Sequence, residues 1–254
     1  MSMAGWLRKS LPDSSLPPDA ILPRMSLEEL SQTIQSNQPM DEEPDLPRSR
    51  MEVVILAVLV EGGLVLGSYP LGWMLGSHPL EQFRYQASDL GWGVLATLPL
   101  IPLFLMLIHL RLGFLEPLRK ISLHTLRPMM SPCTMVDLIG ISLLAGVGEE
   151  MIFRGVIQGW LAKDTPVWSA ILASSISFGF MHSLTPAYFL LATVMGVYLG
   201  WLYHWTGNLL APMMVHFLYD AIALIYITRI WNPPDAPVLR EFIPEDEEEE
   251  TPEE

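Results

Sequence analysis

Three ionisable residues, Glu149, Glu150 and Arg154, stand within a long apolar stretch of the sequence. A charged side chain near the centre of a membrane helix costs about 2.5–3.5 kcal/mol on insertion scales, so such residues usually have both a partner and a function. On a helix, residues four positions apart share a face, whereas consecutive residues diverge by about 100°. We therefore expect Glu150 and Arg154 to form an ion pair, and Glu149 to find its partner on another helix.

Two later apolar stretches contain polar residues that are candidate partners. One ends in His182, and the other carries His216 and Asp220 four positions apart, on one face of a helix. Each histidine taken alone is more typical of a buried side chain that is hydrogen-bonded to a backbone carbonyl than of a catalyst. Together with Glu149, they form a set of carboxylates and imidazoles that is suited to activating water.

Two reactions fit this set. In the first, Glu149 is the general base for a water that His182 orients, while His216 and Asp220 stabilise an oxyanion. In the second, the same groups hold a divalent metal that activates the water. The sequence lacks His-Glu-x-x-His, the most specific helical zinc signature. We therefore favour the first reaction and expect neither a metal nor a cofactor.

Apolar blocks between residues 51 and 231 must position these side chains. Half of the chain is apolar and 17% is charged, and the blocks are about as long as the roughly 20 residues that a helix needs to cross a bilayer. The sequence predicts an all-α, polytopic transmembrane helix bundle of about six spans. The expected spans are 53–75, 90–110, 136–161, 167–182, 187–205 and 209–230.

The composition changes at both ends of the apolar region. Residues 1–50 are polar and rich in Pro, residues 232–254 are acidic, and both have too little apolar surface to offset the entropy of ordering. We predict a disordered arm and a disordered tail. Between them we expect two accessory spans and a basic loop at 51–133, and a catalytic core at 134–231. Within the first of these regions, residues 111–133 are predicted to be a loop or an amphipathic helix at the membrane interface.

The charges indicate an orientation and exclude one class of function. The net charge is −14, but the two ends hold most of the surplus acid, so nothing predicts nucleic-acid binding. Six spans put both termini on one side. Cations gather near that side, at Arg48, Arg50, Arg111, Arg119, Lys120, Arg127 and Arg229. By the positive-inside rule this side is cytoplasmic, and we expect the protein in the plasma membrane of a bacterium, in contact with membrane lipid.

Two features leave alternatives open. Glu61 lies near the middle of the first predicted span with no motif beside it, and we favour a structural role, such as an interhelical hydrogen bond, over a functional one.

The second feature is the depth of His182 in the membrane. Glu149 lies about 20 Å into the third span at 1.5 Å per residue, whereas His182 lies at the end of the fourth. For them to meet, either the third helix begins late, near Ile141, or the fourth extends beyond His182.

The three motifs together resemble the CAAX prenyl protease type II and bacteriocin-processing family, also called the Abi family. The motifs are Glu149-Glu150-x-x-x-Arg154, Phe178-x-x-x-His182 and His216-x-x-x-Asp220, with Ser174-Ser175 and Gly207-Asn208-Leu209 in their company. The resemblance covers about residues 134 to 228. It implies a glutamate-dependent intramembrane endopeptidase with a peptide or protein substrate, free or lipid-linked.

The resemblance also implies a role for each motif residue. Glu149 and His182 would activate water, His216 and the residue at Asp220 would form the oxyanion site, and Glu150 with Arg154 would support the geometry. The prenyl proteases have Asn at the last motif position, which can donate a hydrogen bond, whereas an ionised Asp220 can only accept one. This difference favours Asp220 as the partner that orients His216, or as a protonated group. A non-enzymatic scaffold or immunity-type protein and a metal-dependent membrane peptidase remain the alternative functions.

Overall fold

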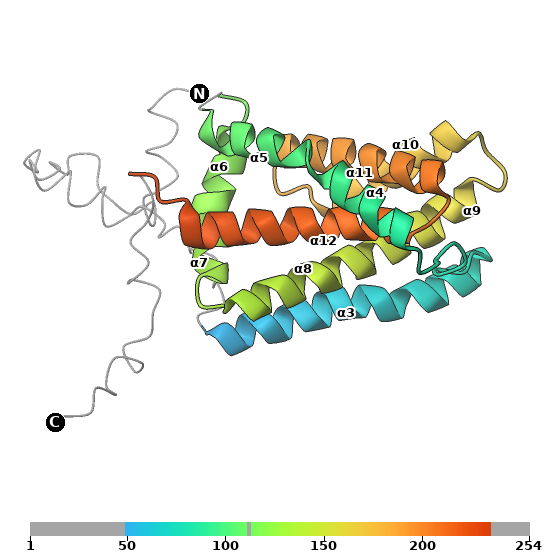
Figure 1. Cartoon of the computed structure of the whole chain (residues 1–254), viewed down its shortest axis with the longest axis horizontal. Helices are drawn as coiled ribbons and strands as arrows, with labels where there is room; N and C mark the ends of the chain where they lie inside the picture. The colour runs from blue at the N-terminus through green and yellow to red at the C-terminus, as the bar shows by residue number, and fades with distance from the viewer. Residues whose placement is uncertain (1–48, 111–112, 235–254) are drawn as a thin grey trace, which may run out of the picture. The chain divides into compact units, whose positions relative to one another are not determined.

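The computed structural model describes residues 49–110 and 113–234, and every element of regular structure in these ranges is a helix (Figure 1). The predicted all-α fold is therefore confirmed. Almost all of the predicted disordered arm and acidic tail lies outside the described residues. The elements are α3 (Arg50–Leu75), α4 (Ala87–Thr97), α5 (Leu100–His109), α6 (Glu116–Ile121), η1 (Ser122–Leu126), α7 (Arg127–Met130), α8 (Met135–Glu150), η2 (Met151–Gln158), α9 (Gly159–Leu161), α10 (Val167–Met181), α11 (Pro186–Thr206), α12 (Leu210–Ile225) and η3 (Tyr226–Ile230).

The first two predicted spans correspond to α3 and to the pair α4–α5. A capping box opens α3, because the Ser49 hydroxyl and the Glu52 carboxylate each accept from the other residue's backbone N–H. The helix ends at Gly76, whose φ of 65° is the left-handed conformation typical of a helix end. The helix is interrupted between α4 and α5 at Leu98 and Pro99, because proline has no backbone N–H to continue the helical hydrogen bonds.

Residues Glu116–Met130, which form α6, η1 and α7, lie across one end of the bundle (Figure 1). They fall in the region predicted to be a loop or an amphipathic helix, and they are helical. The segment is bent by 117° from the helix that follows it. Arg127 donates to the Asn232 side chain at 3.1 Å, and Arg229 donates to the Ser131 carbonyl at 3.1 Å. These contacts hold the segment against the end of η3.

The third predicted span is one continuous helical stretch formed by α8, η2 and α9. Its first turn is fixed by a capping box between Thr134 and Asp137. The Asp137 carboxylate also lies 2.6 Å from Nε of Arg50, so α8 begins beside the beginning of α3 and runs parallel to it. The segment η2 is π-helical, a form that is frequent at functional sites. Hydroxyl groups of Ser174 and Ser77 donate to carbonyls within η2, at 2.7 and 3.2 Å.

The remaining predicted spans are α10, α11 and the pair α12–η3. Among the described residues, four helices are long and apolar enough to cross a membrane: α3, α4–α5, α11 and α12–η3. The bent pair Glu116–Met130 and Met135–Leu161 would make a fifth. All six predicted segments are thus helices. The fourth, α10, has only 15 residues, which is short for a span.

The third span packs between α3 and α12, and two glycines of α8 allow the close approach. A Cβ atom at Gly146 would lie 2.8 Å from the backbone nitrogen of Phe217, and one at Gly148 would lie 2.7 Å from the carbonyl oxygen of Glu61. Neither position has room for a larger residue without a backbone shift. Small residues at such contacts are typical of membrane helix pairs. The two glycines therefore bring α3 and α12 to the turn of α8 that carries Glu149.

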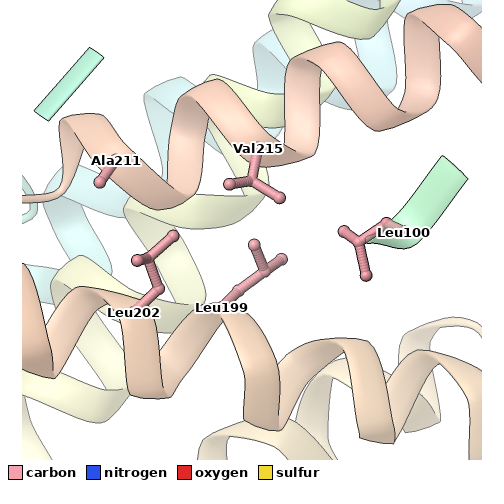
Figure 2. Close-up of a cluster of buried hydrophobic side chains, with 5 residues drawn as sticks. All are labelled: Leu100, Leu199, Leu202, Ala211 and Val215. Atoms are coloured by element: carbon pink, nitrogen blue, oxygen red, sulfur yellow. The ribbon is translucent and has the colours of Figure 1, made fainter. Parts of the chain in front are cut away.

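A cluster of buried apolar side chains fixes the rotation of α12. Figure 2 shows its members, which come from α5, α11 and α12: Leu100, Leu199, Leu202, Ala211 and Val215. Val215 points into this cluster and is fully buried. Since consecutive helical residues diverge by about 100°, the next residue, His216, faces a different neighbour, and its ring contacts Glu150 of α8.

Candidate active site

Glu150 and Arg154 form the predicted ion pair at the centre of the bundle. Nη1 of Arg154 donates to Oε1 of Glu150 at 2.6 Å, and their side chains are 1% and 0% exposed. Nη2 of Arg154 donates to the Gly196 carbonyl of α11 at 3.2 Å, and the guanidinium lies over the Phe178 ring, 4.8 Å from its centre. The pair therefore ties the third span to α10 and α11.

Glu149 has different surroundings. It accepts no hydrogen bond from the described residues, and its Oε2 atom is buried. This oxygen lies 3.8 Å from Nε2 of His182 and 3.7 Å from Nε2 of His216. These separations are too long for a direct hydrogen bond and suit a water that bridges the three groups. As predicted, the partners of Glu149 are on other helices.

His216 connects the two glutamates. Its Nδ1 atom lies 2.9 Å from Oε1 of Glu150. Because an ionised carboxylate can only accept, we assign the proton to Nδ1. Its Nε2 atom faces Glu149 and lies 3.4 Å from Oδ2 of Asp220. The residue is 7% exposed, so both of its nitrogens meet carboxylates inside the protein.

His182 is held by its own helix. Its Nδ1 atom lies 3.0 Å from the Phe178 carbonyl, which assigns the proton to Nδ1 and leaves Nε2 directed toward Glu149. The Phe178 ring packs against the imidazole at a tilt of 34° with centres 4.5 Å apart, and the Tyr188 ring meets it edge-on at 5.7 Å. Phe178 thus supports Arg154 on one side and His182 on another.

His182 lies at the same level of the bundle as Glu149, but for neither of the two reasons expected from the sequence. The third helix does not begin late, because α8 starts at Met135, and the fourth does not extend past His182, because α10 ends at Met181. Instead α10 is short and packs on η2, where Ser174 is bonded to Phe153. The end of α10 therefore lies at the middle of the third span, beside Glu149.

A cavity of about 110 Å³ opens beside the two imidazoles. Its lining comes from α10, α11 and α12 and includes the predicted residues His182, His216 and Asp220. The other lining residues are Phe178, Tyr188, Leu191, Ala192, Met195, Leu199 and Tyr219. The structure thus brings all six predicted site residues together around the cavity or directly behind it. The tyrosines are residues that the motif pattern does not identify.

A larger cavity, of about 370 Å³, lies near the end of the bundle where α3 and α11 end. It is lined by residues such as Ser77, Glu81, Gln158, Lys163 and His204, and it contains none of the predicted site residues. Because cavity volume alone does not supply chemistry, the smaller cavity, where a carboxylate and two imidazoles converge, is the candidate active site.

Glu61 also belongs to the surroundings of this site. It lies in α3 at the contact with Gly148 and interacts electrostatically with Glu149, His216 and Asp220. Its Oε2 atom is buried without a hydrogen-bond partner among the described residues. The interhelical hydrogen bond favoured from the sequence is not present there. The signal that could have identified Glu61 is its position at membrane depth.

Within residues 49–110 and 113–234, no group of three or more His, Cys, Asp or Glu side chains is arranged to hold a metal ion. The metal-dependent reaction therefore stays a prediction from residue types, without a candidate centre in this part of the chain.

Comparison with known proteins gives a family for the central segment. Residues 131–222 match the model of the family described as type II CAAX prenyl endopeptidase Rce1-like. The chain is 32% identical over 97 residues to "Uncharacterized protein YpbD" of Bacillus subtilis, covering 38% of this chain and 48% of that protein. It is 33% identical over 84 residues to "Putative membrane peptidase YdiL" of the same organism, covering 33% and 34%. The chain thus spans half or less of each relative's length, and no solved structure matches it.

Proposed function

We propose that the protein is an intramembrane endopeptidase that uses water activated by Glu149, because residues 131–222 match the Rce1-like type II CAAX prenyl endopeptidase family and several helices are long and apolar enough to cross a membrane. The single observation that carries this mechanism is the unpartnered Glu149 oxygen between two imidazole nitrogens. The other charged residues of the site contribute to the electrostatics that hold this arrangement.

In the proposed reaction, a water lies between Glu149 and His182. Glu149 takes a proton from it as the water oxygen bonds to the carbonyl carbon of the scissile peptide, and the carbonyl electrons move to oxygen. Nε2 of His182 orients the water, since its Nδ1 is bonded to the Phe178 carbonyl. Glu149 then gives the proton to the leaving nitrogen as the C–N bond breaks. The products are one carboxylic acid and one amine.

His216 supports the oxyanion that forms in this step. In its protonated form, Nε2–H faces the cavity beside Asp220, which orients it. Glu150 accepts from Nδ1 of His216 and is itself paired with Arg154. This chain of contacts fixes the imidazole before substrate binds, which is the condition for electrostatic stabilisation of a transition state.

We further propose a substrate that reaches the site from the membrane, either a protein or a peptide carrying a lipid. Most lining residues of the cavity are apolar or aromatic, which suits such a substrate. Five of the eight described Lys and Arg residues lie at the start of α3, in α6 and α7 and in η3: Arg50, Arg119, Lys120, Arg127 and Arg229. Helices α6 and α7 lie at the end of the bundle where α3 begins (Figure 1). By the positive-inside rule this end faces the cytoplasm of a bacterial cell, with residues 134–231 as the catalytic core and 51–133 as its support.

The test compares wild-type protein with Glu149→Gln, both expressed in cells and both purified in detergent. New peptide termini in the membrane proteome identify substrates, and synthetic peptides of those sequences give rates. We expect the variant to lose about 10²–10⁴-fold in rate, the range of general-base catalysis, with unchanged thermal unfolding. Glu81→Gln, the same change in the larger cavity, should keep the wild-type rate. Equal rates for Glu149→Gln and wild type would overturn the mechanism, whereas absence of cleavage by the wild type would favour the scaffold alternative.

Chelation separates this mechanism from the metal-dependent one. With water activated by Glu149 alone, the purified protein should keep its cleavage rate after treatment with EDTA. Loss of the rate with EDTA and its recovery on adding a divalent metal would establish the metallopeptidase instead.

A further inference from the structure

An endopeptidase needs hydrogen-bond donors aimed at the oxygen that becomes negative during attack. The predicted site supplies few such donors. Nδ1–H of His182 is bonded to the Phe178 carbonyl, and Nδ1–H of His216 is bonded to Glu150. An ionised Asp220 accepts hydrogen bonds and cannot donate one. Among these three side chains only Nε2–H of a protonated His216 remains as a donor.

Tyr188 presents a further donor in the same cavity. Its backbone N–H donates to the Thr185 hydroxyl at 3.1 Å, which fixes the residue in the first turn of α11. Its ring meets the His182 ring edge-on, with the ring centres 5.7 Å apart. The residue lines the cavity together with His182, and its hydroxyl has no hydrogen-bond partner among the described residues.

We propose that Tyr188 is a catalytic residue whose hydroxyl donates a hydrogen bond to the oxyanion of the tetrahedral intermediate. This inference rests on the proposed function and deepens it. The proton stays on the phenol oxygen throughout: the O–H group only approaches the carbonyl oxygen as the water adds, and it withdraws when the C–N bond breaks. Tyr188 would thereby supply the donor that Asp220 lacks.

The other tyrosine of the cavity fits this role less well. The Tyr219 ring packs edge-on against Phe104 at 6.0 Å and lies beside two apolar clusters. Tyr188 is therefore the tyrosine that both contacts His182 and lines the cavity.

The test measures kcat and KM for Tyr188→Phe on a peptide that the wild type cleaves. We expect kcat to fall on the order of 10²-fold, as for other oxyanion donors, with KM and thermal unfolding unchanged. The matched control is Tyr198→Phe on the same helix, because the Tyr198 hydroxyl is bonded to the Ala96 carbonyl outside the cavity. It should keep the wild-type kcat.

A second variant separates a catalytic role from a packing role. Asp220→Asn introduces an amide that can donate in the same cavity. The double variant Tyr188→Phe with Asp220→Asn should therefore lose less activity than the product of the two single losses. A wild-type kcat in Tyr188→Phe, or losses that simply multiply, would overturn the role of Tyr188. Equal activity of Glu149→Gln and wild type would instead overturn the proposed function itself.

Discussion

Glu149 and Glu150 are neighbours in the chain, but they lie on two different sides of the same site. On the closed side, Oε1 of Glu150 accepts from both Arg154 and His216, although its Oε2 has no partner among the described residues. On the open side, Glu149 accepts no hydrogen bond from the described residues and faces two imidazole nitrogens beside a cavity. A rotation of about 100° between consecutive residues produces this difference.

One helix can carry several charges at membrane depth when its charged residues are divided between these two sides. On the closed side, Glu150 is hydrogen-bonded to Arg154 and His216, and these contacts hold the helices together. The open side leaves one carboxylate without a fixed donor, which is the state that a general base requires before water arrives. His216 belongs to both sides, because one nitrogen faces each glutamate.

The largest expected effect on stability comes from breaking the closed side. Arg154→Met leaves Glu150 buried without its counter-charge, and removal of one partner from a buried pair typically lowers the free energy of unfolding by about 3–5 kcal/mol. Equilibrium unfolding in mixed detergent measures this quantity. Arg84→Met is the control, since the Arg84 side chain donates to the Gly207 carbonyl at an exposed position. Equal stabilities of the two variants would contradict the division into two sides.

A smaller effect is expected at Glu61, where a third carboxylate approaches the open side. Its electrostatic neighbours are Glu149, His216 and Asp220. Glu61→Gln removes a negative charge that repels the ionised form of Glu149. The acid side of the pH profile of kcat/KM should therefore move to lower pH, with less than about a tenfold change in rate at neutral pH. An unchanged profile would assign Glu61 to packing alone.

The smallest effect is expected at the contact that holds α10 on η2. Ser174→Ala removes the hydrogen bond to the Phe153 carbonyl, which should lower the free energy of unfolding by about 1 kcal/mol. Because this contact positions the end of α10, kcat should also fall, on the order of tenfold. The control is Ser177→Ala, because the Ser177 hydroxyl donates to the Ala173 carbonyl of its own helix. A loss in that variant as large as in Ser174→Ala would refute the positioning role of Ser174.

Much of the fold was predictable because it depends on local composition. Apolar length predicts the helices of the bundle, since a bilayer has no partners for unpaired backbone groups. The ion pair of Glu150 with Arg154 was predictable too, because a spacing of four residues places both on one face. In the structure this pair is present at 2.6 Å.

The position of His182 was not predictable. The sequence suggests a helix end at the membrane face, but the short helix α10 ends at the middle of the third span. The depth of a helix end is set by packing on its neighbours and by its length, and neither has a local signal. The same reason applies to Glu61 and Tyr188, which reach the site only because α3 and α11 pack beside α8 and α10.

The sequence by itself determined which groups are charged, which helices carry them and which residues on one helix share a face. Those properties follow from side-chain chemistry and from the 3.6-residue period. Only the tertiary structure decided that Glu149 meets two imidazoles while Glu150 is paired, and that a tyrosine from a fifth segment enters the same cavity. These outcomes depend on contacts between helices, and small residues such as Gly146 and Gly148 fix their spacing.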